Sequence, residues 1–402
     1  MATRVSNTAA PTIDELEARA EAMLPRLRER AARAEELRRV PDETIDEFTE
    51  AGFFRVFQPA RYGGYELDYG ATQVALSRQL GRACGSSAWV QSVIACHAWL
   101  LGMFSEAAQE AVWANDPDAL ISTAIAMRSG SAQPVDGGYR VEGRWLFSSG
   151  IDSVQWIMIL VPVQTEDGPP QMLLAILPQG DWQSVDTWFA SGLRGTGSKD
   201  LVVTGAFVPE EYTVATELLD GWQAPGGAVN RSYIYQLPLF PVFPYNIATP
   251  ALGIARGAVD EYITLTASRP DRIEQATRHL RIGESSAEVA AAEALLSADA
   301  AEVKRLGEAG ERVPVHTRMK WHRDLAYAAL LCLRAVDRIA GAVGAHGIYE
   351  PNVIQRAARD VRAIVNHAGL AWDTHGVNFG RVSVGLDATH HVAGRISARD
   401  ER

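Results

Sequence analysis

The sequence predicts a mainly α-helical protein in which an antiparallel β module lies between two helical parts. Between residues 143 and 209, apolar runs of strand length are separated by glycine clusters, and apolar and polar residues alternate around Trp145 and Phe147. On both sides the chain is rich in Ala, Leu, Arg and Glu, with apolar residues at helical spacing. We therefore expect an N-terminal helical domain, a middle β domain and a C-terminal helical bundle, at residues 1–118, 119–217 and 218–402.

Five helices are predicted in the N-terminal part, after a tail that ends near Pro11. In the first of them, Leu16, Ala20 and Leu27 recur at helical spacing among Glu and Arg. The fourth is apolar around its whole circumference, so we expect it to be buried on most sides. The predicted spans are 13–39, 41–52, 71–82, 85–101 and 105–114.

The β module is expected from about residue 120 to about residue 214. Residues 156–163 form a short apolar run rich in β-branched side chains, as in a buried strand. Thr204-Gly205 separates two apolar triplets and is typical of a turn.

After the β module, residues 218–244 are rich in proline and aromatic residues and predict a long irregular connection. Its aromatic side chains either close a substrate pocket or simply pack on the bundle; they are Trp222, Tyr233, Tyr235, Phe240, Phe243 and Tyr245. Four long helices are predicted next, at 247–268, 276–306, 314–343 and 353–372. Residues 382–402 are expected to form a weakly ordered tail.

Composition excludes several classes of protein. A net charge of −11 argues against binding to nucleic acid or to an anionic membrane. No apolar run approaches the roughly 20 residues of a membrane span, and the N-terminus lacks the apolar segment of a signal peptide. Cys84, Cys96 and Cys332 lie in apolar helical contexts and predict buried thiols of a cytoplasmic protein. No histidine or cysteine spacing predicts a metal site.

Four motifs, in the same order along the chain, resemble the acyl-CoA dehydrogenase superfamily. VPDETIDEFTEAGFFRVFQPARYGG resembles its opening segment, and IQRAARDVRA resembles its last long helix. GRWLFSSGIDSVQW and GLRGTGSKDLVVTGAFVP resemble the two flavin-side loops of its small β barrel. The resemblance covers about residues 41–380, and it implies that the middle domain is a closed β barrel between two helical domains.

Within that superfamily, three features resemble flavin-dependent monooxygenases rather than dehydrogenases. Dehydrogenases often take their catalytic base from a glutamate placed after the Arg-Asp of the last helix. When the family's motif is aligned on Arg359-Asp360, the position of that glutamate is occupied by Ala368, which cannot remove a proton. His97 resembles a histidine on the flavin-facing helix of phenol-hydroxylating members, and His367 resembles one that faces the reactive flavin position. The strongest resemblance is to oxygenase components of two-component aromatic hydroxylases, such as those acting on p-hydroxyphenylacetate or on phenolic steroid fragments.

This resemblance implies a particular chemistry. A separate reductase supplies reduced flavin, and the oxygenase binds it, adds O2 and protects the resulting flavin hydroperoxide. Such a site needs to exclude water, to hydrogen-bond the central flavin ring and to manage one proton.

The FSSG loop is the first candidate for flavin binding. The resemblance places Phe147, Ser148, Ser149 and Gly150 at the flavin, where a serine hydroxyl or a backbone N–H meets the central-ring nitrogen. Ser149 is therefore a candidate catalytic residue, and Gly150 would allow close approach of the backbone. The alternative is a plain turn with solvated serines.

The RGTGS loop is the second candidate. Arg194, Gly195, Thr196, Gly197 and Ser198 combine a cation, two hydroxyls and clustered backbone N–H groups, which suit flavin oxygens, a phosphate or a polar substrate edge. The alternative is a hairpin in which the glycines are needed only for their positive φ angles.

Two histidines are the candidate catalytic side chains. His367 could stabilise the peroxide by hydrogen bonding and carry a proton near pH 7, and His97 could orient or deprotonate a substrate hydroxyl. The alternatives are a structural histidine and a core histidine between Trp89 and Trp99, respectively.

Arg269 is the last predicted cofactor-binding residue, because it falls near an arginine with which the superfamily reaches the flavin phosphates of a neighbouring subunit. The residues after it, and those at Gly344 to Gly347, depart from the FAD-binding pattern, which favours FMN with FAD as the alternative. Arg359 and Asp360 could form an ion pair within the helix or between subunits, and we expect a structural role for them. By the resemblance, we also expect a homotetramer.

Three rival functions stay open at this point. One is N-oxygenation of an amine, as in amino-sugar relatives. Another is a true dehydrogenase whose base has moved, for instance to Asp373. A flavin-binding protein without turnover is the third.

Overall fold

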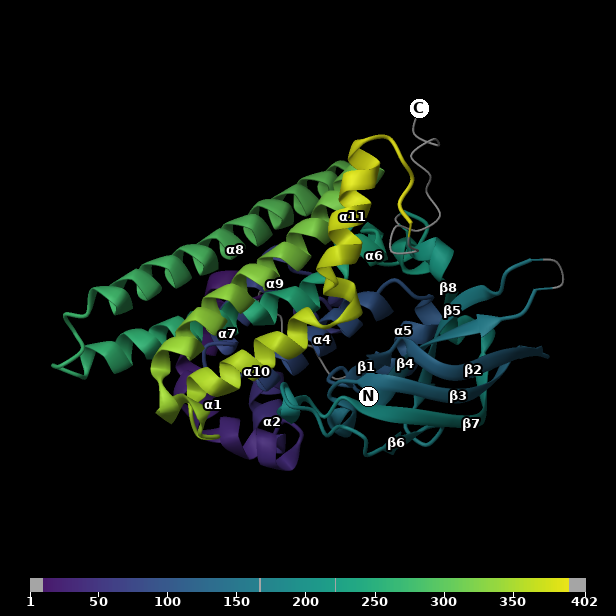
Figure 1. The fold of residues 1–402 in the computed structure, drawn as a ribbon. Helices are drawn as coiled ribbons and strands as arrows, with labels where there is room; N and C mark the ends of the chain where they lie inside the picture. Colours follow the sequence, from purple (N-terminus) through teal and green to yellow (C-terminus); the bar gives the residue numbers. More distant parts are fainter. Residues whose placement is uncertain (1–9, 166–167, 221, 390–402) are drawn as a thin grey trace.

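The protein was analysed as a computed structural model, which describes residues 10–165, 168–220 and 222–389. Most helices and a single sheet occupy different ends of the molecule, with helix α4 (Gly85–Leu101) between them (Figure 1). Within the described ranges, no helix is both long and apolar enough to cross a bilayer.

The N-terminal helices follow the predicted order. They are α1 (Ile13–Leu37), α2 (Asp42–Glu50), α3 (Tyr69–Leu80), α4 (Gly85–Leu101) and α5 (Glu106–Trp113). A capping box starts α1, since the Thr12 hydroxyl accepts from the Glu15 N–H while the Glu15 carboxylate accepts from the Thr12 N–H. All 17 residues of α4 are buried, as its uniformly apolar sequence predicts. That burial places α4 where the bundle meets the sheet.

The middle domain is an open mixed sheet, so the expectation of a closed antiparallel barrel is wrong. Its strands are β1 (Ile121–Ala124), β2 (Ala126–Val135), β3 (Gly138–Ser148), β4 (Trp156–Val163), β5 (Gln171–Pro178), β6 (Gln183–Val185), β7 (Lys199–Pro209) and β8 (Thr213–Ala215). They pair in the order β6-β7-β3-β2-β4-β5-β8, while β1 runs parallel to β4. Closure requires the two edge strands to pair. Here β6 and β8 have three residues each and, among the described residues, do not pair with one another.

Thr204-Gly205 is a bulge rather than the predicted turn. Strand β7 runs through it, and the register slips so that Val141 lies opposite Ala206 while Gly143 lies opposite Val203. Strand β7 therefore has one more residue than β3 between these pairs. Gly205 lies in this bulge with a positive φ of 63°, which glycine adopts without strain. A glycine inside a strand pattern therefore bends this strand without ending it.

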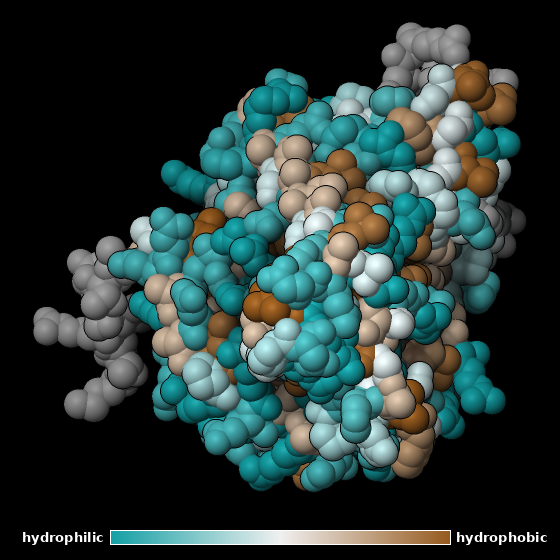
Figure 2. Space-filling model, turned by 60° about the vertical axis from the view of Figure 1, so that its left-hand side comes forward, coloured by the Kyte–Doolittle hydropathy of each residue, from teal (hydrophilic) through white to brown (hydrophobic). Residues whose placement is uncertain are grey.

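The C-terminal part is a bundle of long helices. After four short 3₁₀ and α-helical segments between 216 and 242, it contains α7 (Tyr245–Ala267), α8 (Ala276–Ala309), α9 (Val315–Val343), α10 (Val353–Val365) and α11 (Trp372–Ser383). The last of the short segments is α6 (Leu239–Val242). In Figure 1, α7 and α8 extend away from the sheet and are joined at the far tip of the bundle. Apolar side chains on the face seen in Figure 2 form separate spots among hydrophilic ones.

The predicted irregular connection packs on the helices. The Tyr235 hydroxyl donates to the Phe57 carbonyl at 3.0 Å, and the Trp99 indole N–H donates to the Ile234 carbonyl at 2.6 Å. Tyr235 and Tyr245 are fully buried. For these two aromatic residues the structure favours packing on the bundle over closure of a pocket.

The last predicted helix is interrupted. Helix α10 ends at Val365, a 3₁₀ turn spans Ala368–Leu370, and α11 begins at Trp372. Helix α11 extends to Ser383, two residues into the predicted tail, and the part of that prediction at 390–402 lies outside the described residues. The His367 side chain caps the turn: its Nδ1 accepts from the Gly369 N–H at 3.0 Å. Short-range capping of this kind offers the backbone an alternative to helix.

Candidate active site

Hydroxyl groups from three segments meet in the interior beside α4. Ser148 Oγ lies 2.7 Å from Ser122 Oγ in β1, and Ser149 Oγ lies 2.7 Å from Ser198 Oγ. Ser198 Oγ in turn lies 2.6 Å from Thr196 Oγ1. All five side chains are buried. The structure thus brings together the hydroxyls of the two predicted loops and adds Ser122, which sequence reasoning missed.

The direction of this hydroxyl relay follows from its two ends. The Trp89 indole N–H donates to Ser149 Oγ at 3.0 Å, and the Thr196 hydroxyl donates to the Leu193 carbonyl at 2.9 Å. A hydroxyl has a single proton to donate, so Ser198 donates to Thr196 and Ser149 donates to Ser198. Ser149 therefore has its proton committed inside the protein, and its remaining lone pair can accept from a ligand N–H.

The 193–198 turn is built from unusual backbone. Leu193 has φ 51° and Gly197 has φ 58°, and the Gly195 N–H donates to Ser86 Oγ of α4 at 3.1 Å. The Thr196 carbonyl accepts from the Gly150 N–H at 2.9 Å, which ties this turn to the FSSG loop. Within the part of the chain that the structure describes, the Arg194 side chain makes no hydrogen bond or ion pair. A cation without an anionic partner, in a protein of net charge −11, suits an anionic ligand.

Phe147 is held in a strained and exposed conformation. Its φ is 65°, and it lies where the β3–β7 register slips between Trp145 and Ser148. Its side chain is 58% exposed and meets the edge of Trp188 at 6.3 Å between ring centroids. A non-glycine residue with positive φ costs on the order of 1 kcal/mol or more and marks candidate functional positions. The exposed ring next to the hydroxyl relay could cover an aromatic ligand.

His97 is buried on α4 and neutral. Its Nδ1 lies 2.9 Å from the Ile121 carbonyl, which can only accept, so Nδ1 carries the proton. Nε2 then has a free lone pair, and no hydrogen bond to it is found among the described residues. Burial lowers the pKa of His97 to about 4, although the carbonyl contact opposes that shift. His97 thus presents a hydrogen-bond acceptor.

His367 has the opposite tautomer. Because its Nδ1 accepts from the Gly369 N–H, the proton of the neutral ring lies on Nε2. Burial lowers the pKa of His367 to about 4 as well. Its ring lies 6.1 Å from that of Trp89, the residue that also donates to Ser149. His367 thus presents a donor, and Trp89 joins it to the hydroxyl relay.

Arg269 does not approach this site within one chain. It belongs to the segment that joins α7 to α8, and Figure 1 shows this segment at the tip of the bundle remote from the sheet. Its predicted contact with a neighbouring subunit's flavin stays a prediction. Asp373, the candidate base of the dehydrogenase alternative, is exposed in the first turn of α11.

Within one chain, Arg359 and Asp360 do not pair with each other. Arg359 pairs instead with Glu35 of α1 at 2.8 Å, and Asp360 accepts from the Leu193 backbone N–H at 2.6 Å. Neighbours in a helix point about 100° apart, so each side chain finds its own partner. Sequence reasoning missed Asp360, Trp89 and Ser86 as parts of the site because their partners are remote in sequence.

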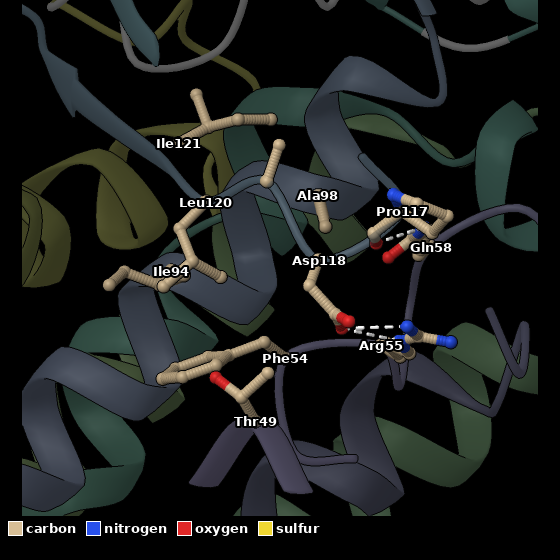
Figure 3. A pocket seen from close by; sticks show the side chains of 11 residues that line it. Thr49, Phe54, Arg55, Gln58, Ile94, Ala98, Pro117, Asp118, Leu120 and Ile121 are labelled. Atoms are coloured by element: carbon tan, nitrogen blue, oxygen red, sulfur yellow. Dashed lines mark hydrogen bonds and ion pairs between the residues drawn. The ribbon is translucent and has the colours of Figure 1, made fainter. Parts of the chain in front are cut away.

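A small hollow lies beside α4, and its lining includes Ile121, whose carbonyl contacts His97. Figure 3 shows Ile94 and Leu120 beside it, together with the paired Arg55 and Asp118. Its volume of about 10 Å³ suits one water molecule. None of the predicted cofactor-binding residues lines it.

The residues present fit a flavin. Phe147 offers an aromatic face, Arg194 a cation without a partner, and Ser149 an acceptor lone pair. A reduced flavin combines an aromatic ring system, ring N–H donors and a phosphate, so each of these groups has a complementary part in it.

Comparison with known proteins supports the same family. Two family models match: "Acyl-CoA dehydrogenase, N-terminal domain" over residues 14–116 and "Acyl-CoA dehydrogenase, C-terminal domain" over residues 245–372. The oxygenase subunit HsaA of a flavin-dependent monooxygenase from Rhodococcus jostii (strain RHA1) is 36% identical over 92% of this chain and 98% of its own length.

Two further relatives agree. The oxygenase component of FADH(2)-dependent resorcinol hydroxylase from Rhizobium sp. (strain MTP-10005) is 32% identical over 90% of this chain and 91% of that protein. The crystal structure of 3-HSA hydroxylase from Rhodococcus sp. RHA1 superimposes with a TM-score of 0.91 and 35% identity, over 95% of this chain and 100% of that one. The predicted membership is confirmed: the chain belongs to the acyl-CoA dehydrogenase superfamily and, within it, to the flavin-dependent monooxygenases that serve as oxygenase components.

Proposed function

We propose that this oxygenase component hydroxylates a phenolic aromatic substrate, with reduced FMN supplied by a separate reductase and O2 as co-substrate. The observation that carries the proposal is the pair of neutral imidazoles with opposite tautomers, His97 with a free acceptor nitrogen and His367 with a donor. Hydroxylating a phenol needs both functions: an acceptor for the substrate's O–H and a donor toward the oxygen that acquires negative charge.

The flavin is expected to lie against Phe147 and the two joined loops. When bound and reduced, it supplies the chemistry of activating O2 and delivering one oxygen atom. The lone pair of Ser149 is directed by the relay to accept from a flavin ring N–H, and Arg194 is available to an anionic part of the cofactor.

His97 acts on the substrate as an acceptor rather than as a strong base. With a pKa of about 4 it cannot hold the proton of a phenol in the resting complex. It would orient the O–H and accept its proton as the ring is oxygenated, when the phenol becomes far more acidic. This ordering keeps a charged phenolate out of a buried site, where it would be costly.

His367 donates from Nε2. With a pKa of about 4 it remains neutral at pH 7, so its role is a fixed donor rather than the proton carrier that the sequence suggested. The Gly369 N–H holds the ring in that tautomer.

Three finer features are part of the proposal. FMN is favoured over FAD because Pro270 and the 344–347 segment depart from the FAD-binding pattern, although one relative is named as FADH(2)-dependent. A homotetramer is expected from the superfamily's bundle and would let Arg269 reach a neighbour's flavin. Three buried free thiols support a reducing, cytoplasmic location.

The test is direct transfer of oxygen. The purified protein is mixed with chemically reduced FMN or FAD, ¹⁸O2 and a panel of phenols, and products are analysed by mass spectrometry while hydrogen peroxide is measured in parallel. We expect one ¹⁸O atom in a catechol-type product, with little peroxide when the right phenol is present. Flavin oxidation that yields only peroxide with every phenol would refute the proposal.

An amine panel in the same assay distinguishes N-oxygenation. His97→Gln should strongly slow phenol hydroxylation, whereas an N-oxygenase would keep its rate because an amine lone pair needs no base. The exposed His346→Gln serves as the matched control.

A further inference from the structure

The backbone carbonyl and the backbone N–H of Leu193 both anchor the turn at residues 193–198. Its carbonyl accepts the end of the hydroxyl relay from Thr196, and also the Trp188 indole N–H at 3.0 Å. Its N–H donates to Asp360 Oδ1 at 2.6 Å. The positive φ of Leu193 is unfavourable for a non-glycine residue and persists only where surrounding contacts impose it. The Asp360 contact is the one that acts on the Leu193 backbone from a different domain.

The turn approaches helices very closely on three sides. A Cβ on Gly192 would lie 2.0 Å from the Arg359 carbonyl of α10, and one on Gly195 would lie 2.9 Å from Ala34 Cβ of α1. On the third side, Ser86 of α4 accepts from Gly195. Loop and helices are therefore in backbone contact, and a small displacement of α10 would move the turn.

Asp360 is unusual among the acids of this region. It is 2% exposed, and the nearby Arg356 and Arg359 both pair with Glu35, at 3.1 and 2.8 Å. Its second oxygen faces the start of α4, since a Cβ on Gly85 would lie 2.8 Å from Oδ2. Burying a carboxyl that has no cation of its own costs free energy. The hydrogen bond from the Leu193 N–H offsets part of that cost, which indicates that this contact is why an acid stands here.

We propose that Asp360 is a positioning residue that fixes the register between His367 and the hydroxyl relay. Helix α10 carries Asp360 and ends just before His367, while Leu193 ends the relay that begins at Trp89. The Asp360 hydrogen bond acts at the relay's own end, beside the bond from Arg359 to the Ser191 carbonyl at 2.6 Å, and so fixes the donor imidazole relative to the flavin-side hydroxyls. The inference rests on the proposed function, because that function gives these two groups a common ligand.

The test compares Asp360→Ala, which removes the acceptor, with Asp360→Asn, which keeps an acceptor oxygen. Asp299→Asn is the matched control, since Asp299 is also buried but pairs with Lys320 in the bundle. Three quantities are measured on the full chain: hydrogen exchange of the 193–198 amides, the dissociation constant of FMN, and the fraction of reduced flavin that ends as hydrogen peroxide.

For Asp360→Ala we expect hydrogen exchange of the 193–198 amides to become roughly 10- to 100-fold faster and the dissociation constant of FMN to rise by a similar factor. Most of the reduced flavin should then end as hydrogen peroxide. Asp360→Asn should stay within roughly 3-fold of the wild type in all three quantities, and Asp299→Asn should leave them unchanged.

Wild-type exchange and wild-type peroxide release in Asp360→Ala would overturn the inference, as would a loosened turn that still binds FMN and hydroxylates normally. If Asp360→Ala does not fold, Asp360→Asn decides: peroxide release like the wild type supports the inference, whereas release as high as that of His367→Ala overturns it. Failure of the proposed function itself would show separately, as a wild-type protein that transfers no ¹⁸O to any phenol.

Discussion

At the scale of single residues, the site depends on which nitrogen of each histidine carries the proton. The Ile121 carbonyl makes His97 an acceptor at Nε2, and the Gly369 N–H makes His367 a donor at Nε2. Two identical side chains thus gain complementary roles from one backbone group each.

Replacement of His97 by Gln tests its role in catalysis. Gln fits the space approximately but cannot take a proton, so we expect kcat for phenol hydroxylation to fall by about 100-fold or more. The FMN dissociation constant should remain within about 2-fold, because His97 is assigned to the substrate. Steady-state rates and a flavin titration measure both. An unchanged kcat would show that His97 is a core residue only.

The buried imidazole of His97 also predicts a pH dependence of stability. Its folded pKa of about 4 lies below the unfolded value of 6.5, so the unfolded state binds the proton first as pH falls. Stability is therefore fully present above pH 6.5 and is lost between pH 6.5 and 4. Relative to His97→Gln, the wild type should lose on the order of 3 kcal/mol over that window. Urea unfolding at several pH values tests this, and parallel curves for the two proteins would contradict it.

At the scale of elements, close contacts between backbones position the site. Helix α4 supplies Ser86, Trp89 and His97, and it packs against α7, which in turn crosses α3 at two glycines. A Cβ on Gly253 of α7 would lie 2.0 Å from the Ser77 carbonyl of α3 and 2.8 Å from Gly81 Cα. Helices can approach this closely only where side chains are absent.

Two glycines in long helices should therefore respond with opposite sign to alanine. Gly253→Ala should destabilise the protein by about 1–3 kcal/mol, because α3 and α7 must separate. Gly283→Ala, at an exposed α8 position with open space around the new Cβ, should stabilise it by about 0.5–1 kcal/mol. Denaturant unfolding gives both values. If the two changes had the same sign, the close crossing would not be a constraint.

At the scale of the whole molecule, the predicted flavin site is divided between two regions of the fold that lie far apart. The relay and its turn lie at the sheet, whereas the α7–α8 connection, to which Arg269 belongs, lies at the bundle tip (Figure 1). The two can act on one flavin only if a second copy of the chain supplies Arg269.

Arg269→Ala tests this arrangement. We expect FMN to bind about 10-fold more weakly, with the difference shrinking at high salt because the contact is electrostatic. Arg272→Ala is the neighbouring control, since Arg272 pairs with Asp271 at 3.5 Å. Light scattering should give the same molecular mass for the wild type, Arg269→Ala and Arg272→Ala. Equal FMN affinities would remove Arg269 from the site.

Local patterns in the sequence determined the helices, the strands and the two flavin-side loops, because periodicity, glycine placement and motif identity are properties of neighbouring residues. They also led to the family, through four motifs in one order.

Tertiary structure alone decided the open sheet, the break before His367, the direction of the hydroxyl relay and the partner of Asp360. Strand closure, tautomers and buried hydrogen bonds are set by groups brought together from distant positions, such as Leu193 and Asp360, 167 residues apart. No local pattern encodes such a contact, because its energy exists only once both segments are buried together.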